Sequence, residues 1–121
     1  MVPGIKEIQK QIISCCDCPR LVSFRSQIAE KKRKSFMDWD YWGKPVPGYG
    51  DPKSKLLILG LAPAAHGGNR TGRVFTGDKS ADFLFKCLSA VGLSNQAESE
   101  SRDDGLKITG YMTVAVKCVP P

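Results

Sequence analysis

The first thirty residues carry apolar side chains at helical spacing. Four isoleucines predict a short amphipathic helix over residues 4–14: Ile5, Ile8, Ile12 and Ile13. A second helix is predicted to begin at Pro19, because proline suits the first helical turn, where its missing N–H would have no partner. Its apolar stripe is formed by Leu21, Phe24 and Ile28, and it runs into a basic block at residues 30–34.

An irregular segment and a continuous apolar run follow. Residues 36–55 are rich in proline, glycine and aromatic side chains, which predicts an ordered loop packed by its aromatic rings rather than a regular element. The run "KLLILGL" at residues 55–61 shows no alternation of polar and apolar positions after its lysine. This pattern predicts a buried strand of a parallel sheet.

A helix and a second strand follow the glycine-rich stretch at residues 60–78. Five residues are expected to share one helical face: Phe83, Leu84, Cys87, Leu88 and Val91. Gly92 is the expected stop signal of this helix, and residues 107–119 are rich in β-branched residues, which predicts a strand. The order predicts a βαβ unit with parallel strands. Because ligands bind beyond the carboxyl ends of such strands, we expect the glycine loop and Cys118 to emerge at that edge.

The glycine-rich stretch "GLAPAAHGGNRTGRVFTGD" holds candidate chemistry. It lacks the dinucleotide fingerprint G-x-G-x-x-G, and Asp78 stands where a P-loop has lysine, so a nucleoside triphosphatase is not expected. Phe75 either anchors the loop in the core or stacks on a base. Asp78 either caps the next helix or holds a water or a developing positive charge. His66 either bonds within the loop or takes part in catalysis. Three other polar residues either contact phosphates or form a solvated face: Asn69, Arg70 and Arg73.

Charge and composition narrow the class of partner. The chain of 121 residues has a formal net charge of +6, and 41% of its residues are hydrophobic, as in ordinary globular proteins. A basic chain favours a polyanionic partner, and the block Lys31–Lys34 is either a solvated helix end or a phosphate contact. Because the sequence shows neither a run of about 20 apolar residues nor the apolar core of a signal peptide, we expect a soluble cytoplasmic protein.

Five cysteines in an intracellular chain favour a metal site or a reactive thiol over disulfides. Cys15 and Cys18 form a C-x-x-C pair, a half-site for zinc or an iron–sulfur cluster, and Cys118 is a candidate third ligand. The alternatives are two buried free thiols, or a small redox protein that uses this pair as a dithiol. Cys16 is expected to point away from the pair and Cys87 to lie in the core.

Four segments occur in an order that resembles one enzyme family. They are "CCDCPRLVSFR", "YWGKPVPGYGDP", "LLILGLAPAAHGGNRTGRVFTGDKSADFL" and "YMTVAVKCVPP". Together they resemble the uracil-DNA glycosylase superfamily and, within it, the type-5 iron–sulfur branch. The resemblance implies an α/β fold, a three-layer α/β/α sandwich with a central parallel sheet of four strands. It also implies hydrolysis of the N-glycosidic bond of uracil, and of other deaminated bases, in base-excision repair.

The resemblance assigns roles to individual residues. Cys15, Cys18 and Cys118 match three of the four ligands of a [4Fe–4S] cluster. The candidate substrate-binding residues are the first active-site motif, the aromatic that stacks on the base and two polar loop residues: Gly60, Leu61, Ala62, Pro63, Ala64, Phe75, His66 and Asn69. Asp78 matches the catalytic acidic residue that acts through water. Because the first motif is wholly apolar here, the acidic role falls on Asp78.

The resemblance also implies that residues 1–121 are the N-terminal half of such a domain, truncated after its second strand. Family members continue beyond the final "CVPP" with a base-reading asparagine, the fourth cluster cysteine and a histidine-bearing second motif. We therefore expect this half alone to be inactive and to hold a cluster poorly. The whole protein is expected to be a monomer that acts on DNA at the nucleoid. The alternative is a metal-stapled α/β module that binds nucleic acid or nucleotides without catalysis.

Overall fold

The computed structural model describes residues 4–121. In chain order its elements are α1 (Ile5–Ile13), α2 (Pro19–Lys31), the 3₁₀ turn η1 (Lys34–Phe36), β1 (Tyr49–Gly50), β2 (Leu57–Gly60), α3 (Gly68–Thr71), α4 (Lys79–Ala90) and β3 (Tyr111–Val114). The two predicted N-terminal helices are confirmed, and Pro19 occupies the first turn of α2. Among the described residues, no helix is both long and apolar enough to cross a membrane.

The strands form one small mixed sheet in the order β1–β3–β2. β2 and β3 run parallel, with Leu57 opposite Tyr111 and Gly60 opposite Val114, which confirms the predicted βαβ unit around α4. β1 runs antiparallel to β3, so the sheet is mixed rather than purely parallel as expected. The strand was missed because it is only two residues long and lies in a segment whose composition predicts a loop.

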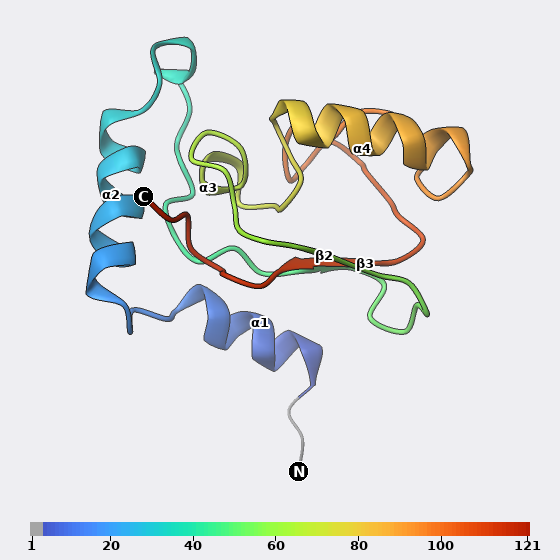
Figure 1. Ribbon diagram of the computed structural model, residues 1–121, viewed down its shortest axis with the longest axis horizontal. Coiled ribbons are helices and arrows are strands. Elements are labelled where there is room, and N and C mark those ends of the chain that lie inside the picture. Colours follow the sequence, from blue (N-terminus) through green and yellow to red (C-terminus); the bar gives the residue numbers. More distant parts are fainter. Residues whose placement is uncertain (1–3) are drawn as a thin grey trace.

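Helices lie on both sides of this sheet. In Figure 1 the strands run between α4 on one side and α1 on the other, while α2 lies beside the C-terminal end of the chain. The buried core contains residues from β3, α4 and the segments that flank the strands: Val46, Val74, Ala81, Phe85, Leu88, Met112 and Val114. The helix–sheet–helix arrangement is the layered α/β fold that the sequence predicts.

α4 buries a face that overlaps only in part with the one predicted: Leu88 is buried and Leu84 packs against the core, as expected. Its buried residues are Ala81, Phe85 and Leu88, at the i, i+4, i+7 spacing of one helical face. Phe83 is 74% exposed, Val91 is 70% exposed, and Cys87 is also exposed rather than in the core. The predicted face, counted at helical spacing from Phe83, combined residues that lie on a buried face and on an exposed face of the helix. Gly92 follows the helix with φ +77, which confirms it as the stop.

β2 is not buried on both faces, although its apolar run predicts this. Leu57, Leu59 and Leu61 are 60%, 61% and 78% exposed, whereas Ile58 packs against the core. The reason is that alternate side chains of a strand point to opposite faces, and the face that carries the leucines is not covered by the described residues. β2 is also an edge strand, paired only with β3. One face of β2 contacts the core, and the leucine face is open in the described part of the chain.

The parallel pair brings two segments to one edge of the sheet. β3 ends at Val114, earlier than the predicted boundary at residue 119. Beyond it, the N–H groups of Ala115 and Val116 donate to the carbonyl oxygens of Gly60 and Leu61, at 3.0 and 2.9 Å. The glycine loop and the segment that leads to Cys118 therefore leave the sheet together, as predicted.

Candidate functional site

An open cleft of about 670 Å³ lies beside the glycine-rich loop. Segments far apart in the sequence form its wall: residues 64–67 with Arg70, the first turn of α4 from Gly77 to Asp82, the aromatic turn around η1, and residues 99–100. The volume lies in the range of about 300–1,000 Å³ that is usual for small-ligand sites. The cleft is therefore large enough for a nucleotide base.

Asp78 stands at the rim of this cleft and caps α4. Its Oδ1 accepts a hydrogen bond of 2.8 Å from the N–H of Ala81, and its backbone is extended, as is usual for an N-cap residue. Its Oδ2 lies over Gly67, where a Cβ atom would come within 2.5 Å of this oxygen. Gly67 therefore makes room for the carboxylate, and one carboxylate oxygen is used by the cap while the other has no hydrogen-bond donor among residues 4–121.

His66 lies in the cleft wall and is held from behind by Tyr41. The Tyr41 hydroxyl lies 2.8 Å from His66 Nδ1, and the two rings meet edge to face. Burial, together with the positive charges of Arg33 and Arg70, lowers the pKa of His66 below its ordinary value of 6.5. The imidazole is therefore neutral at neutral pH.

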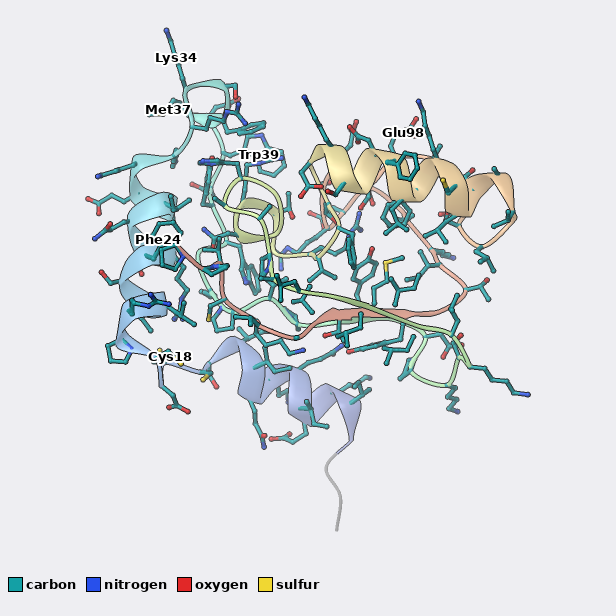
Figure 2. All side chains as sticks on the ribbon, viewed as in Figure 1. Cys18, Phe24, Lys34, Met37, Trp39 and Glu98 are labelled. Atoms are coloured by element: carbon teal, nitrogen blue, oxygen red, sulfur yellow. The ribbon has the colours of Figure 1, made fainter. Side chains whose placement is uncertain are left out.

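Arg70 connects the aromatic turn to both sides of the glycine loop. Its guanidinium carbon lies 3.8 Å from the centre of the Phe36 ring and 4.1 Å from that of Trp39. Its Nε donates to the carbonyl of His66, and Nη2 donates to that of Gly77. Figure 2 shows Trp39 beside α3, where this turn approaches the glycine loop. Burial lowers the pKa of Arg70, which nevertheless stays charged.

The apolar motif at residues 60–64 lies partly in the cleft wall and partly at the end of β2, where Phe75 also lies. Ala64 lies in the cleft wall, Pro63 is buried, and Leu61 is exposed on the open face. Phe75 is half-buried, packs against the core and adopts φ +49, a strained value for a non-glycine residue. A Cβ at Gly60 would come within 2.7 Å of Phe75 Cζ, so this glycine allows the ring to lie on the strand end.

Asn69 and Arg73 lie in the interior rather than on a solvated face. Asn69 is fully buried; its Nδ2 donates to the carbonyl of Arg25 at 3.4 Å, and its Oδ1 has no partner among the described residues. Arg73 donates to Thr76, Ser99 and Asp104, the last at 2.9 Å. Both side chains are buried, so the alternative of a solvated loop face is wrong for both, and neither belongs to the cleft wall formed by the described residues.

An ion pair between the buried Arg73 and the half-buried Asp104 supports the glycine loop. Burial acts to raise the pKa of Asp104, but hydrogen bonds from Arg73 and from the N–H groups of Glu100 and Leu106 outweigh it and hold the pKa at about 2. In turn, the Gly77 N–H donates to the carbonyl of Ser99 at 2.7 Å. These bonds fix the backbone that presents Asp78 to the cleft.

Two of the three candidate cluster ligands line a second cavity, of about 340 Å³. Cys15 and Cys118 line it together with residues of α1, and Cys18 lies nearby at the start of α2, where Figure 2 labels it. Arg25 reaches the same place: its Nη1 donates to Cys118 Sγ at 3.2 Å. Within residues 4–121, no three potential metal ligands are gathered into one group. The residues therefore fit a cluster only in part, with two of the three predicted ligands around one cavity.

Several residues of these sites were not predicted from the sequence. The cleft wall includes Phe36 and Trp39, and the buried Arg25 reaches Cys118 beside the cysteine cavity. Arg33 also lies in the cleft wall, and it belongs to the basic block for which the sequence left a solvated helix end or a phosphate contact open. The available signals were the aromatic-rich segment after the basic block, and a charged residue adjacent to the apolar stripe of α2. Neither pattern indicates which cavity a side chain will reach.

Known proteins match most of this chain. The model of the uracil DNA glycosylase superfamily matches residues 47–121. The chain is 54% identical to the type-5 uracil-DNA glycosylase of Pyrobaculum aerophilum, with 92% of this chain and 49% of the relative covered. It is 52% identical to the protein of that name from Mycobacterium bovis, with 98% and 44% covered, and 50% identical to the one from Thermus thermophilus, with 91% and 50% covered.

These matches agree with the resemblance carried by the glycine-rich stretch and the segment around β3. The chain spans about half the length of the curated relatives it matches. The family match covers more than half of the chain and includes the cleft-forming loop, β2, α4 and β3. The chain therefore belongs to the uracil DNA glycosylase superfamily.

Proposed function

We propose that this chain supplies the cleft of an enzyme that excises uracil, and other deaminated bases, from DNA. The observation that carries the proposal is the position of Asp78, which faces the cleft with one carboxylate oxygen free of hydrogen bonds from residues 4–121. The names of the relatives support uracil as the substrate. Because those relatives are about twice as long, we propose that the activity also needs the other half of their length.

The proposed reaction breaks the bond between the base and C1′ of the deoxyribose. A base in duplex DNA can enter the cleft only after it has flipped out of the helix. Asp78 Oδ2 accepts a proton of the attacking water while its Oδ1 stays bound to Ala81, so the cap keeps the carboxylate in place. Water adds its oxygen to C1′, and the base leaves with the electron pair of the broken bond.

The residues around Asp78 suit a flat, uncharged base. We propose that Ala64 and Gly67 form a wall without protruding side chains, and that the neutral His66 contributes a polar contact. Phe75 lies next to Gly60, at the end of β2, and stacking on a base there requires the base to reach beyond the cleft wall. The inward position of Asn69 argues for a role in holding α2 against α3 rather than for contact with the base.

We further propose that Cys15, Cys18 and Cys118 hold a [4Fe–4S] cluster whose fourth ligand comes from the other half of the protein. The shared cavity supports this proposal, because it joins the end of α1 to the segment after β3. Such a cluster would pin the N-terminal helices to the sheet and take no part in the reaction. Iron and sulfide content, measured with and without Cys118→Ser, tests this part separately.

Release of uracil tests the proposed function. The chain is joined to the second half of the Pyrobaculum aerophilum relative and given oligonucleotides that contain one uracil or, as control, one thymine. We expect release of uracil only, and no release by the 121 residues alone. Binding of both oligonucleotides without release would favour the alternative, a nucleic-acid-binding module. A colourless protein with a reversible Cys15–Cys18 dithiol would favour the redox alternative.

A further inference from the structure

The hydroxyl of Tyr41 joins the end of α2 to the cleft. Lys32, the C-cap of α2, adopts φ +60, and the next residue, Arg33, donates its backbone N–H to the Tyr41 hydroxyl at 3.1 Å. The same hydroxyl lies 2.8 Å from His66 Nδ1. Tyr41 is not part of the cleft wall formed by the described residues, whereas His66 is. Tyr41 therefore contacts the imidazole through Nδ1 from outside the cleft wall.

The direction of the second hydrogen bond follows from counting donors and acceptors. A backbone N–H can only donate, so the Tyr41 oxygen accepts from Arg33. The phenol keeps one proton of its own, and His66 Nδ1 is the acceptor within reach. If Nδ1 carried a proton instead, the Tyr41 proton would have no partner among residues 4–121. The arrangement in which every one of these donors has an acceptor has a lone pair on Nδ1 and the ring proton on Nε2.

We propose that Tyr41 is a positioning residue that holds His66 as its Nε2–H tautomer, so that the cleft presents a neutral N–H donor to an oxygen of the bound nucleotide. The use of this donor in catalysis rests on the proposed function, whereas the tautomer itself does not. The donor suits either a carbonyl oxygen of the base or a phosphate oxygen, because both accept hydrogen bonds.

The charges around the ring favour the same state. Arg33, from the basic block, and Arg70, from α3, both disfavour a charged imidazole, as does burial. The acidic side chains of the cleft wall, Asp78, Asp82 and Glu100, come from α4 and the loop before β3. A neutral ring donates from Nε2 only in the tautomer that carries its proton there, and the hydrogen bond from the Tyr41 hydroxyl to Nδ1 favours this tautomer.

The test uses the fact that His66 is the only histidine of the chain. A long-range ¹H–¹⁵N spectrum of the imidazole, recorded at pH about 7.5, well above the ordinary histidine pKa of about 6.5, reports which ring nitrogen carries the proton. In the unsubstituted 121-residue chain we expect the proton on Nε2. Tyr41→Phe keeps the ring contact but removes the hydroxyl, so the ratio of the Nε2–H to the Nδ1–H form should fall about tenfold.

Tyr49→Phe is the matched control, because the Tyr49 hydroxyl bonds to Met112 rather than to His66 and the ratio should stay unchanged. A proton on Nδ1 in the unsubstituted chain, or an unchanged ratio in a folded Tyr41→Phe variant, would overturn the proposal. Uracil release is measured in a separate experiment, so the tautomer ratio can be interpreted even if the proposed function is wrong.

Addition of uracil or, in a second sample, inorganic phosphate then identifies the acceptor. A shift of the Nε2 signal with uracil assigns the donor to a base carbonyl, and a shift with phosphate assigns it to the DNA backbone. If neither compound shifts the signal when it is present in large excess over the protein, the donor role is overturned.

Discussion

At the scale of single residues, the position of the Asp78 carboxylate in the cleft depends on side chains that hold the loop backbone. Arg70 fixes the carbonyls of His66 and Gly77, and Arg73 with Asp104 fixes the loop from below. Such buried polar networks stabilise a fold only when every member has a partner, and removal of one member leaves an uncompensated charge.

The Arg73–Asp104 pair predicts an acid dependence of stability. The pKa of Asp104 is about 2 in the folded chain against an ordinary value of 3.8, so the carboxylate stabilises the fold fully above about pH 4. This contribution is lost as the pH falls from about 4 to 2. We expect Asp104→Asn to lower the free energy of unfolding at pH 7 by roughly 2 kcal/mol, measured by urea denaturation, and to reduce its fall between these pH values.

Asp103→Asn is the control for this prediction, because Asp103 is an exposed neighbour with the same charge. Its free energy of unfolding should stay within about 0.5 kcal/mol of the unsubstituted chain. Equal effects of the two substitutions would show that the loss of charge, and not the buried pair, sets the stability.

Gly67 predicts a second effect at the residue scale. In Gly67→Ala the new Cβ would lie 2.5 Å from Asp78 Oδ2, so the carboxylate must move away from its cap on Ala81. We expect a loss of about 1 kcal/mol in the free energy of unfolding, the usual cost of a lost N-cap. Ser80→Ala, at an exposed position in the first turn of α4, is the control and should show no loss, because alanine is a good helix former.

At the scale of elements, α4 is attached to the sheet through one narrow stripe. Phe85 is fully buried, whereas Phe83, two positions earlier on the same helix, is 74% exposed. Phe85→Ala should therefore lower the free energy of unfolding by about 3–5 kcal/mol. Phe83→Ala should change it by less than about 0.5 kcal/mol. A larger loss for Phe83→Ala in thermal or urea unfolding would mean that α4 packs through its other face.

The sequence predicted these elements better than it predicted their faces. Periodicity located α1, α2, α4 and the parallel pair β2–β3, because each carries a repeated local signal. It could not show that β2 lies at an edge, since an apolar run looks the same in an edge strand and a central one. It also could not locate the two-residue β1, whose pairing depends on β3 more than sixty residues later.

In the candidate site, too, the residues with a local sequence signal were predicted, and those that depend on distant contacts were not. The glycine loop and Asp78 could be predicted because they are contiguous in the sequence, between a predicted strand and a predicted helix. Phe36 and Trp39 were not found, because they reach the cleft only after α2 and η1 have turned the chain back towards α3. The inward direction of Asn69 depends on contact with α2, which no local pattern encodes.

At the scale of the whole molecule, the leucine face of β2 is exposed in the described residues 4–121. Leu57, Leu59 and Leu61 form an apolar strip on an edge strand, a feature that folded proteins usually cover. The relatives are about twice as long as this chain, so we expect the other half of their length to cover this strip.

Leu59→Lys tests what covers the strip. In the 121 residues alone the side chain is 61% exposed, and the substitution should cost less than about 0.5 kcal/mol in the free energy of unfolding. In the chain joined to the second half of a relative, burial of the lysine should cost about 2 kcal/mol or more. Met37→Lys, at an exposed position near Lys34 and away from the sheet (Figure 2), should have no effect in either protein. An equal, small effect of Leu59→Lys in both would show that the strip stays open.

The central claim is that the free carboxylate oxygen of Asp78 drives base excision in this cleft, and the most direct test is the rate of uracil release by the joined protein with Asp78→Asn. Asparagine still caps a helix, so stability should be kept while the rate falls at least about 100-fold, as expected when a general base is removed. Asp103→Asn, outside the cleft wall, should leave the rate unchanged. A rate for Asp78→Asn within threefold of the unsubstituted protein, roughly 0.7 kcal/mol in barrier height, would contradict the claim.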